Sequence, residues 1–255
     1  MTGSGADADP VLSRGGALTR RPSAERFHTR RDWLDSRHSF SFAGHDHPDW
    51  RGFGPLLVIN EDHIAPGGGF GMHPHADMEI ITVMLSGCLR HRDSLGHSER
   101  LLAGEVQRMT AGSGIVHSEI NDGAEPCHLL QIWIQPVHAG LPPDYEQKAM
   151  PPGHEWTALI DPQRQAGALA IDRPLRLWRV QPPAGAVLPL PGELATARQG
   201  WLQLIAGDLQ LDLPDGPDEG SVPLAAGDGL GLEQPRGGQL RAGPAGADLL
   251  LFAWS

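Results

Sequence analysis

The chain has 255 residues, of which 40% are apolar and 20% charged, a composition that can bury a hydrophobic core and is unlike that of disordered or membrane-embedded proteins. Its formal net charge is −11, and no cluster of Lys and Arg stands out, which argues against direct binding to nucleic acid. The 33 glycines and 23 prolines follow no collagen-like period and are typical of many turns between short strands, so the composition predicts an all-β architecture.

Residues 1–25 are predicted to form a disordered tail. The opening MTGSGADADPVLSRGG lacks the basic and apolar regions of a secretory signal. No apolar run reaches the roughly 18 residues that a membrane span requires. We therefore expect a cytoplasmic protein without a membrane partner.

The pattern His-x-His occurs twice in the first half of the chain. His45 and His47 lie among glycine, aspartate and proline, in a stretch typical of a loop, where solvated histidines are the ordinary interpretation. His73 and His75 lie in FGMHPHADMEIITVMLSG, which otherwise predicts a buried strand. One such pair is more often a surface or polar-core feature than a pair of ligands, so the pattern by itself does not establish a metal site.

A second pair with the same spacing, His117 and Glu119, follows in TAGSGIVHSEIN. Alternate side chains of a strand share a face, so this pair would point to one side of its strand. In a regular strand the same rule gives one face to four earlier residues, which are His73, His75, Asp77 and Glu79. Three imidazoles and one carboxylate that converge inside a β-barrel suit a divalent transition metal and leave positions open for a substrate.

RHRDSLG, with His91 and Asp93, raises the possibility of a catalytic dyad. Asp-Ser-Leu-Gly is however a good hairpin turn, and the alternating charges fit a strand that faces solvent. We therefore assign this motif to structure.

Proline and glycine are dense in GLPPDYEQKAMPPG, a composition typical of a connection between two packed units. We place the connection at 140–155, between a metal-binding domain at 26–139 and a second domain at 156–255. All thirteen histidines fall between His28 and His154. The second domain is therefore predicted to lack a metal site, and the whole chain to bind one ion.

The two halves share a pattern of glycine turns. Gly87 and Gly104 are 17 residues apart in the first half, and Gly207 and Gly227 are 20 apart in the second. Each half also closes on an apolar strand that contains tryptophan, LLQIWIQ or DLLLFAWS. The pattern predicts a duplicated β unit with a sandwich or closed barrel in each half, although any two β domains can share such turns.

The histidine pairs and their neighbouring glycines resemble the two motifs of the cupins. The first motif is matched, with one extra residue before its last glycine, by Gly67, His73, His75, Glu79 and Gly87. The second is matched, with TAGSG in place of Pro-x-Gly, by Gly104, Gly114, His117 and Asn121. Within the cupins, HPHADMEIITVMLSGCLRHRDSLGH, GEVQRMTAGSGIVHSE and LQIWIQP are similar to the pirin family, strongly in the first half and weakly in the second.

The resemblance implies an all-β bicupin with two jelly-roll-like barrels. It also implies a metal held by four ligands, which are His73, His75, His117 and Glu119. Iron(II) is the first expectation, with nickel, manganese, copper, cobalt or zinc as alternatives. Glu79 is the rival carboxylate, since many cupins bind the metal there. Four residues beyond His75 it would lie roughly 13 Å along a regular strand, so we expect Glu119 as the ligand.

The resemblance to bacterial pirins implies quercetin 2,3-dioxygenase activity, with a flavonol-like aromatic and dioxygen as substrates. Glu119, as a ligand and nearby base, would take the proton of the substrate hydroxyl. The alternative is a regulatory protein, without enzymatic activity, whose metal or redox state changes its affinity for a protein partner. For either function we expect a monomer.

Overall fold

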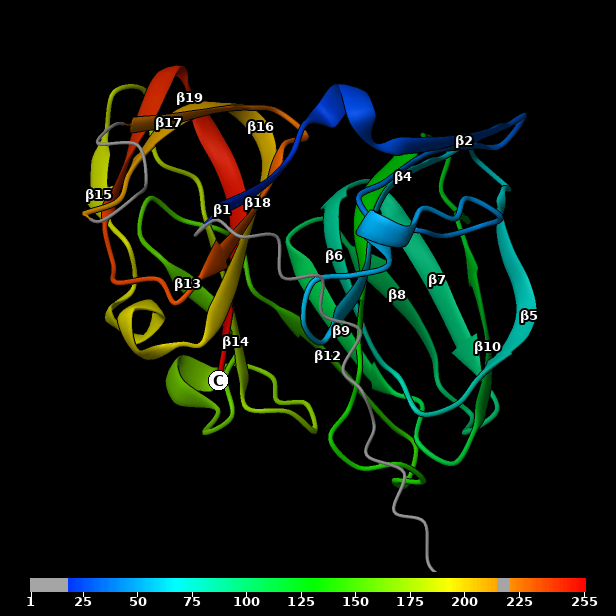
Figure 1. Ribbon diagram of the computed structural model, residues 1–255. Helices are drawn as coiled ribbons and strands as arrows, with labels where there is room; N and C mark the ends of the chain where they lie inside the picture. The colour runs from blue at the N-terminus through cyan, green and yellow to red at the C-terminus, as the bar shows by residue number, and fades with distance from the viewer. Residues whose placement is uncertain (1–17, 215–220) are drawn as a thin grey trace, which may run out of the picture.

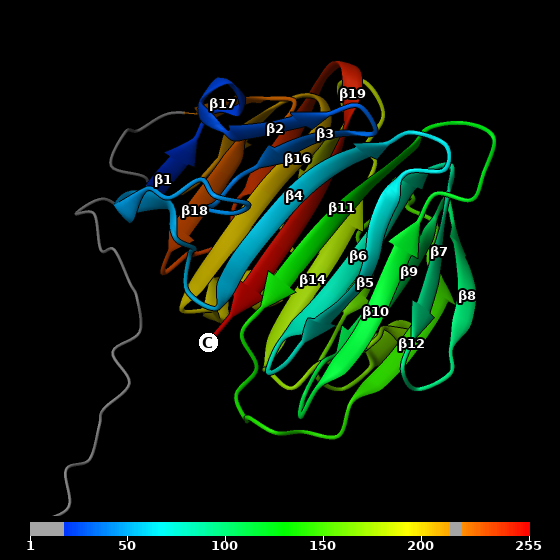
Figure 2. The ribbon, with the colours of Figure 1, turned by 90° about the vertical axis from the view of Figure 1, so that its right-hand side faces the viewer.

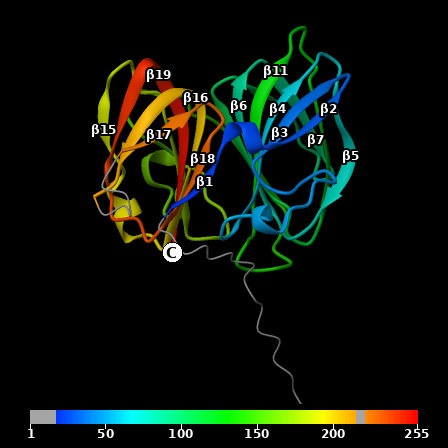
Figure 3. The same cartoon turned by 45° about the horizontal axis from the view of Figure 1, so that its top comes forward.

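The computed structural model describes residues 18–214 and 221–255, and in these ranges the regular secondary structure is nearly all strand (Figure 1). The strands form two barrels that stand side by side (Figure 3). Four short 3-10 helices interrupt them, η1 (Ser23–Glu25), η2 (Pro48–Trp50), η3 (Gln165–Gly167) and η4 (Gly192–Thr196). The prediction of an all-β chain with a barrel in each half is confirmed.

The N-terminal barrel consists of a seven-stranded and a four-stranded sheet (Figure 2). The larger sheet has the order β12-β9-β6-β11-β4-β3-β2. Its strands are β2 (Phe27–Arg31), β3 (Leu34–His38), β4 (Leu56–Ile64), β6 (Glu79–Ser86), β9 (Glu105–Thr110), β11 (Cys127–Ile134) and β12 (Asp144–Ala149). The smaller sheet has the order β5-β10-β7-β8, with β5 (Gly69–His75), β7 (Cys88–Asp93), β8 (Ser98–Leu102) and β10 (Ile115–Ile120).

The C-terminal barrel is one eight-stranded sheet that folds over itself. Two long strands, β16 (Gln199–Asp212) and β19 (Gln239–Trp254), pair along most of their length, and irregularities in their register let them bend. The other strands are β1 (Leu18–Arg21), β13 (Thr157–Ile160), β14 (Leu175–Val180), β15 (Val187–Pro189), β17 (Ser221–Ala225) and β18 (Gly229–Glu233).

Two segments differ from the sequence-based expectation. Strand β1 pairs with β18, so the part of the predicted disordered tail from residue 18 onward is folded; residues 1–17 of that tail lie outside the described range. Strand β12, in the predicted connection 140–155, pairs with β9 and completes the edge of the seven-stranded sheet. The prolines and glycines of this segment correctly indicate turns. They do not reveal that the residues between the turns form an edge strand, which hydrogen-bonds to β9.

The largest hydrophobic cluster lies between the two barrels, because alternate side chains of the seven-stranded sheet point to opposite faces. Ile81 and Leu130 face the C-terminal barrel and pack in one cluster with Leu177 and Phe252. Burying a side chain of this size contributes roughly 1.5–3 kcal/mol. The opposite face of the same sheet is left to line the interior of the N-terminal barrel.

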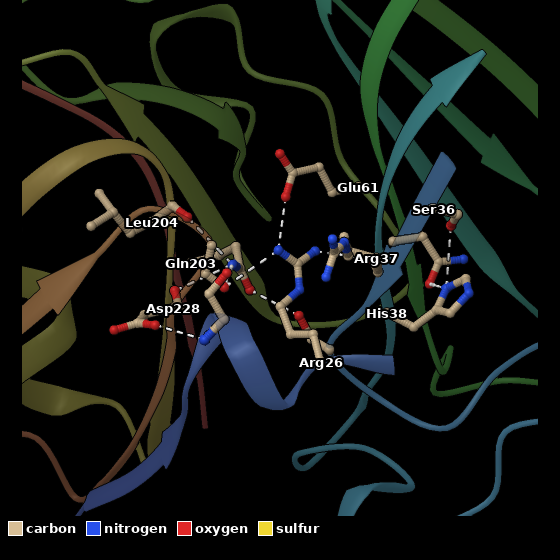
Figure 4. Close-up of polar contacts among 12 residues, drawn as sticks. Arg26, Ser36, Arg37, His38, Glu61, Gln203, Leu204 and Asp228 are labelled. Atoms are coloured by element: carbon tan, nitrogen blue, oxygen red, sulfur yellow. Dashed lines mark hydrogen bonds and ion pairs between the residues drawn. The ribbon is translucent and has the colours of Figure 1, made fainter. Parts of the chain in front are cut away.

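The segment between β1 and β2 joins the barrels through a buried arginine (Figure 4). Arg26 donates to Glu61 Oε2 at 2.7 Å on the N-terminal side, and its Nη1 lies 3.4 Å from the carbonyl oxygen of Gly227 on the C-terminal side. The backbone N–H of Ser23 donates to Asp228 Oδ1 at 2.7 Å. Because hydrogen bonds are directional, these polar contacts help to fix how the two barrels are oriented across their apolar interface.

Candidate metal centre

Three histidines from two neighbouring strands converge in the N-terminal barrel. His73 and His75 lie on β5 and His117 on β10, where His117 stands directly opposite His73. One ring nitrogen from each lies within 4.8 Å of the others, and the ring centroids are 4.4 to 4.9 Å apart. His117 is fully buried, while the two histidines of β5 are half-buried. The structure therefore brings together the three histidines that the sequence singled out.

Glu119 lies two residues beyond His117 on β10 and is also buried, with 2% of its surface exposed. Its Oε2 accepts a hydrogen bond from Gln131 Nε2 at 2.7 Å, and its Oε1 a longer one of 3.4 Å from Thr82. A carboxylate oxygen of Glu119 lies within 4.8 Å of ring nitrogens of His117 and His91. Glu119 is thus grouped with His117 and His91 rather than with the two histidines of β5.

The chemistry of these side chains fits a divalent transition metal. Both ring nitrogens of His117 are buried without a hydrogen-bond partner, which costs roughly 1–3 kcal/mol for an isolated polar group. Burial, followed by the charge of neighbouring histidines, lowers the pKa of His117 to about 3 and that of His75 to about 4. Both imidazoles are therefore neutral near pH 7, and neutral imidazole is the form that binds a metal.

Glu79 lies away from the histidines. Asp77 has a φ of +49°, and between His75 and Glu79 the chain passes from the four-stranded to the seven-stranded sheet. The expectation of one regular strand face through this stretch is therefore wrong. The oxygens of Glu79 accept from Thr110 Oγ1 at 2.7 Å and from the backbone N–H of Asp172 at 3.0 Å, so this carboxyl contacts the chain beyond the connection.

His45 and His47 occupy a loop, as predicted. The ring of His45 stacks on Phe27 with 5.3 Å between centroids. His47 precedes η2 and accepts the backbone N–H of Asp49 on its Nδ1. Within the described ranges, neither histidine belongs to a group of side chains that could hold a metal.

His91 was predicted to face solvent, and this is wrong because its side chain is fully buried. Its ring lies 5.3 Å from that of His117 and stacks on Tyr145 at 4.5 Å. The charged neighbours of His91 suggested an exposed strand, but the alternation of Leu89 and His91 on one face was an available signal. The tertiary register places His91 opposite Glu119.

A row of polar side chains that the sequence analysis missed crosses the seven-stranded sheet. Its members stand directly opposite one another on six consecutive strands, and they are Gln147, Gln107, Thr82, Gln131, Asn60 and His38. Directly opposite residues share a face, and the bond from Gln131 to Glu119 shows that this face is the barrel interior. Single polar residues inside apolar strands, such as Thr82 in EIITVMLS, were the signal for this row.

Asp62, on the same inner face of β4, predicts a pH-dependent stability of the metal-free protein. Burial raises the pKa of Asp62 to about 7; the carboxylate of Glu119 adds to the rise, and a hydrogen bond from Ser36 opposes it. The folded carboxyl keeps its proton up to about pH 7 whereas the unfolded one loses it near 3.8, so the folded state binds more protons between these values. The free energy of unfolding should therefore fall as the pH rises through this window, by about 2–4 kcal/mol from this group.

Urea unfolding at both ends of the window tests this. Asp62→Asn, which cannot ionise, should lose that part of the pH dependence and should be more stable than the parent at the upper end. An equal slope in parent and variant would show that the Asp62 carboxyl does not keep its proton.

Together these features define a class of protein, an all-β bicupin with a candidate metal centre in its N-terminal barrel. Residues 20–134 match the family model described as Pirin. A quercetin 2,3-dioxygenase of Escherichia coli (strain K12) is 37% identical over 235 residues, which cover 91% of this chain and 96% of that protein. The chain belongs to the pirin family.

Solved structures agree with this assignment. YhhW from Escherichia coli superposes with a TM-score of 0.85 at 36% identity, over 93% of this chain and 97% of that one. The structure of the bacterial pirin YhhW in complex with nickel(II) gives a TM-score of 0.84 at the same identity, over 93% and 98%. In residues 18–214 and 221–255 of the present chain, no helix has the length and apolar character that crossing a membrane requires.

Proposed function

We propose that this protein is a metal-dependent dioxygenase that cleaves flavonols such as quercetin. The observation that carries the proposal is the buried His117, without a partner on either ring nitrogen, beside His73, His75 and the carboxylate of Glu119. The similarity to a quercetin 2,3-dioxygenase over nearly the whole chain supports the choice of reaction. Iron(II) remains our first choice of metal, and the nickel(II) complex of the E. coli relative supports nickel as an alternative.

His73, His75, His117 and Glu119 would hold one divalent ion per chain. When bound, the ion supplies Lewis-acid chemistry toward the substrate oxygen and dioxygen. Glu119 would take the proton of the flavonol hydroxyl. Gln131 holds Oε2 of this carboxylate at 2.7 Å, whereas Oε1 has only the longer contact to Thr82, so Oε1 is the freer oxygen for proton transfer.

The rim of the histidine cluster is aromatic, which suits a flat polyphenol. Trp133 lies edge-on to His75 with 4.9 Å between ring centroids, and Phe42 packs against Trp133 at 5.3 Å. The indole Nε1–H of Trp133 is buried without a partner and is available to donate a hydrogen bond to a bound ligand. In the proposed reaction both atoms of dioxygen enter the product and one ring carbon leaves as carbon monoxide.

Incubation of the metal-loaded protein with quercetin under air tests this function. We expect loss of the flavonol absorbance together with release of carbon monoxide, one per quercetin consumed, and elemental analysis should give one ion per chain. The metal-free protein is the control. Tight binding of one ion without turnover would contradict the dioxygenase and favour the regulatory alternative, and two tightly held ions would contradict the assignment of a single centre.

A further inference from the structure

His91 has the surroundings of a metal ligand although neither histidine pair of the sequence includes it. Its Nε2 lies 3.0 Å from Oδ2 of Asp93. A carboxylate only accepts hydrogen bonds, so in the neutral imidazole the proton lies on Nε2 and the lone pair on Nδ1. Metal-binding histidines almost always donate their other ring N–H to a carboxylate, a backbone carbonyl or water in this way.

The orientation of His91 is held from two sides. Oδ1 of Asp93 accepts the backbone N–H groups of Leu95 at 2.9 Å and His97 at 3.1 Å, which fixes the carboxylate at the hairpin turn. The ring of Tyr145 stacks on His91 at 4.5 Å and on His97 at 4.8 Å. The lone pair on Nδ1 of His91 is therefore held in one direction.

The Nδ1 atom of His91 is buried and has no hydrogen-bond partner. His91, His117 and Glu119 each place a potential ligand atom within 4.8 Å of the other two, and all three residues are buried. The two ring nitrogens of His117 are also without partners. One carboxylate and two imidazoles thus meet in the interior, and three of the four ring nitrogens have no hydrogen-bond partner, a set of groups that suits a divalent transition metal.

We propose that His91, His117 and Glu119 form an inner position for the divalent ion. It shares His117 and Glu119 with the outer position of the proposed function, which His73 and His75 complete. His117 belongs to both groups, so a single ion occupies one position or the other and the stoichiometry stays at one. The inner position is closed to solvent, whereas the outer one borders the half-buried histidines of β5. The inference rests on the metal centre of the proposed function, but not on the identity of its substrate.

Binding of cobalt(II) or nickel(II) alone, measured by competition with a chelator, tests the inner position. His73→Ala damages the outer group and should weaken binding, yet the variant should still hold one ion through the inner group. His91→Phe in the His73→Ala background should lower the affinity further by at least about 100-fold, more than the loss of a residue that only supports a ligand. It should also change the visible absorption of the cobalt(II) protein, because a nitrogen ligand is lost.

The matched control is His97→Phe in the same background, since His97 also contacts Asp93 and Tyr145 but lies outside both groups of ligands. It should cost less affinity than His91→Phe, because His97 only supports Asp93 and Tyr145, and it should keep the cobalt(II) spectrum, because no ligand is lost. If His91→Phe does not fold, His91→Gln replaces it, and proton NMR of the cobalt(II) protein gives an independent measurement. Coordination through Nδ1 leaves the Nε2 proton of His91 as a shifted, exchangeable signal that His91→Gln should remove.

Equal cobalt(II) affinity and equal spectra with and without His91 would overturn the inner position. That result is distinguishable from failure of the proposed function. In the first case the parent still binds one ion and consumes quercetin; in the second, the parent does not consume quercetin, whatever the His91 variants do to metal binding.

Discussion

His117→Ala is expected to remove most of the metal affinity of the protein. His117 is the buried histidine at the centre of the cluster, it belongs to both groups of potential ligands, and none of its ring nitrogens has another partner. Loss of a residue that merely supports a ligand costs 10- to 100-fold in affinity, so the loss of this imidazole should cost at least about 100-fold. Elemental analysis after dialysis and chelator competition measure the effect.

The controls for this variant are His45→Ala and His47→Ala, which alter the other His-x-His pair. Both residues lie in the loop that leads into η2, and we expect the variants to retain as much metal as the parent. Equal metal loss from a loop variant and from His117→Ala would mean that the centre has been assigned to the wrong histidines.

Glu119→Gln is expected to lower turnover far more than metal content. The substitution keeps the size of the side chain and one coordinating oxygen, and three imidazoles remain nearby, so part of the metal should be retained. It removes the group that would take the substrate proton, and positioned general bases contribute roughly 10²- to 10⁴-fold in rate. Turnover per bound metal should fall within that range.

The pH dependence of this deficit separates the loss of a base from the loss of a ligand. A substrate that is already ionised needs the base less, so the deficit of Glu119→Gln should shrink as the pH rises through the pKa of the substrate hydroxyl. A deficit that is constant with pH would argue for a change in metal binding geometry instead.

Glu79→Gln is the matched carboxylate control. Glu79 is buried, and burial raises its pKa, while Thr110 and the backbone of Asp172 donate to its two oxygens. We expect a change in the free energy of unfolding of about 1–3 kcal/mol and little change in turnover per metal. Loss of turnover in Glu79→Gln with parental behaviour in Glu119→Gln would reverse the roles of the two carboxylates.

The sequence by itself determined the features that depend on local pattern. Glycine turns between short apolar runs predicted the all-β chain with a barrel in each half, and the structure confirms it. The spacing of two in His73 and His75 indicated one strand face, and the two side chains do lie together. The composition around His45 identified its loop. These inferences needed only the alternation of side chains along a strand and the residue preferences of turns.

Only the tertiary structure decided which strands pair with each other and which face of each strand is buried. Asp77 has a positive φ, so the strand face that begins at His73 does not continue to Glu79. Glu79 instead accepts a hydrogen bond from Asp172, 93 residues away in sequence. Burial of His91 depends on the strand register that sets it opposite Glu119. Cross-strand pairing and sheet packing are nonlocal, so the spacing of residues along one strand does not show which of its faces becomes the interior.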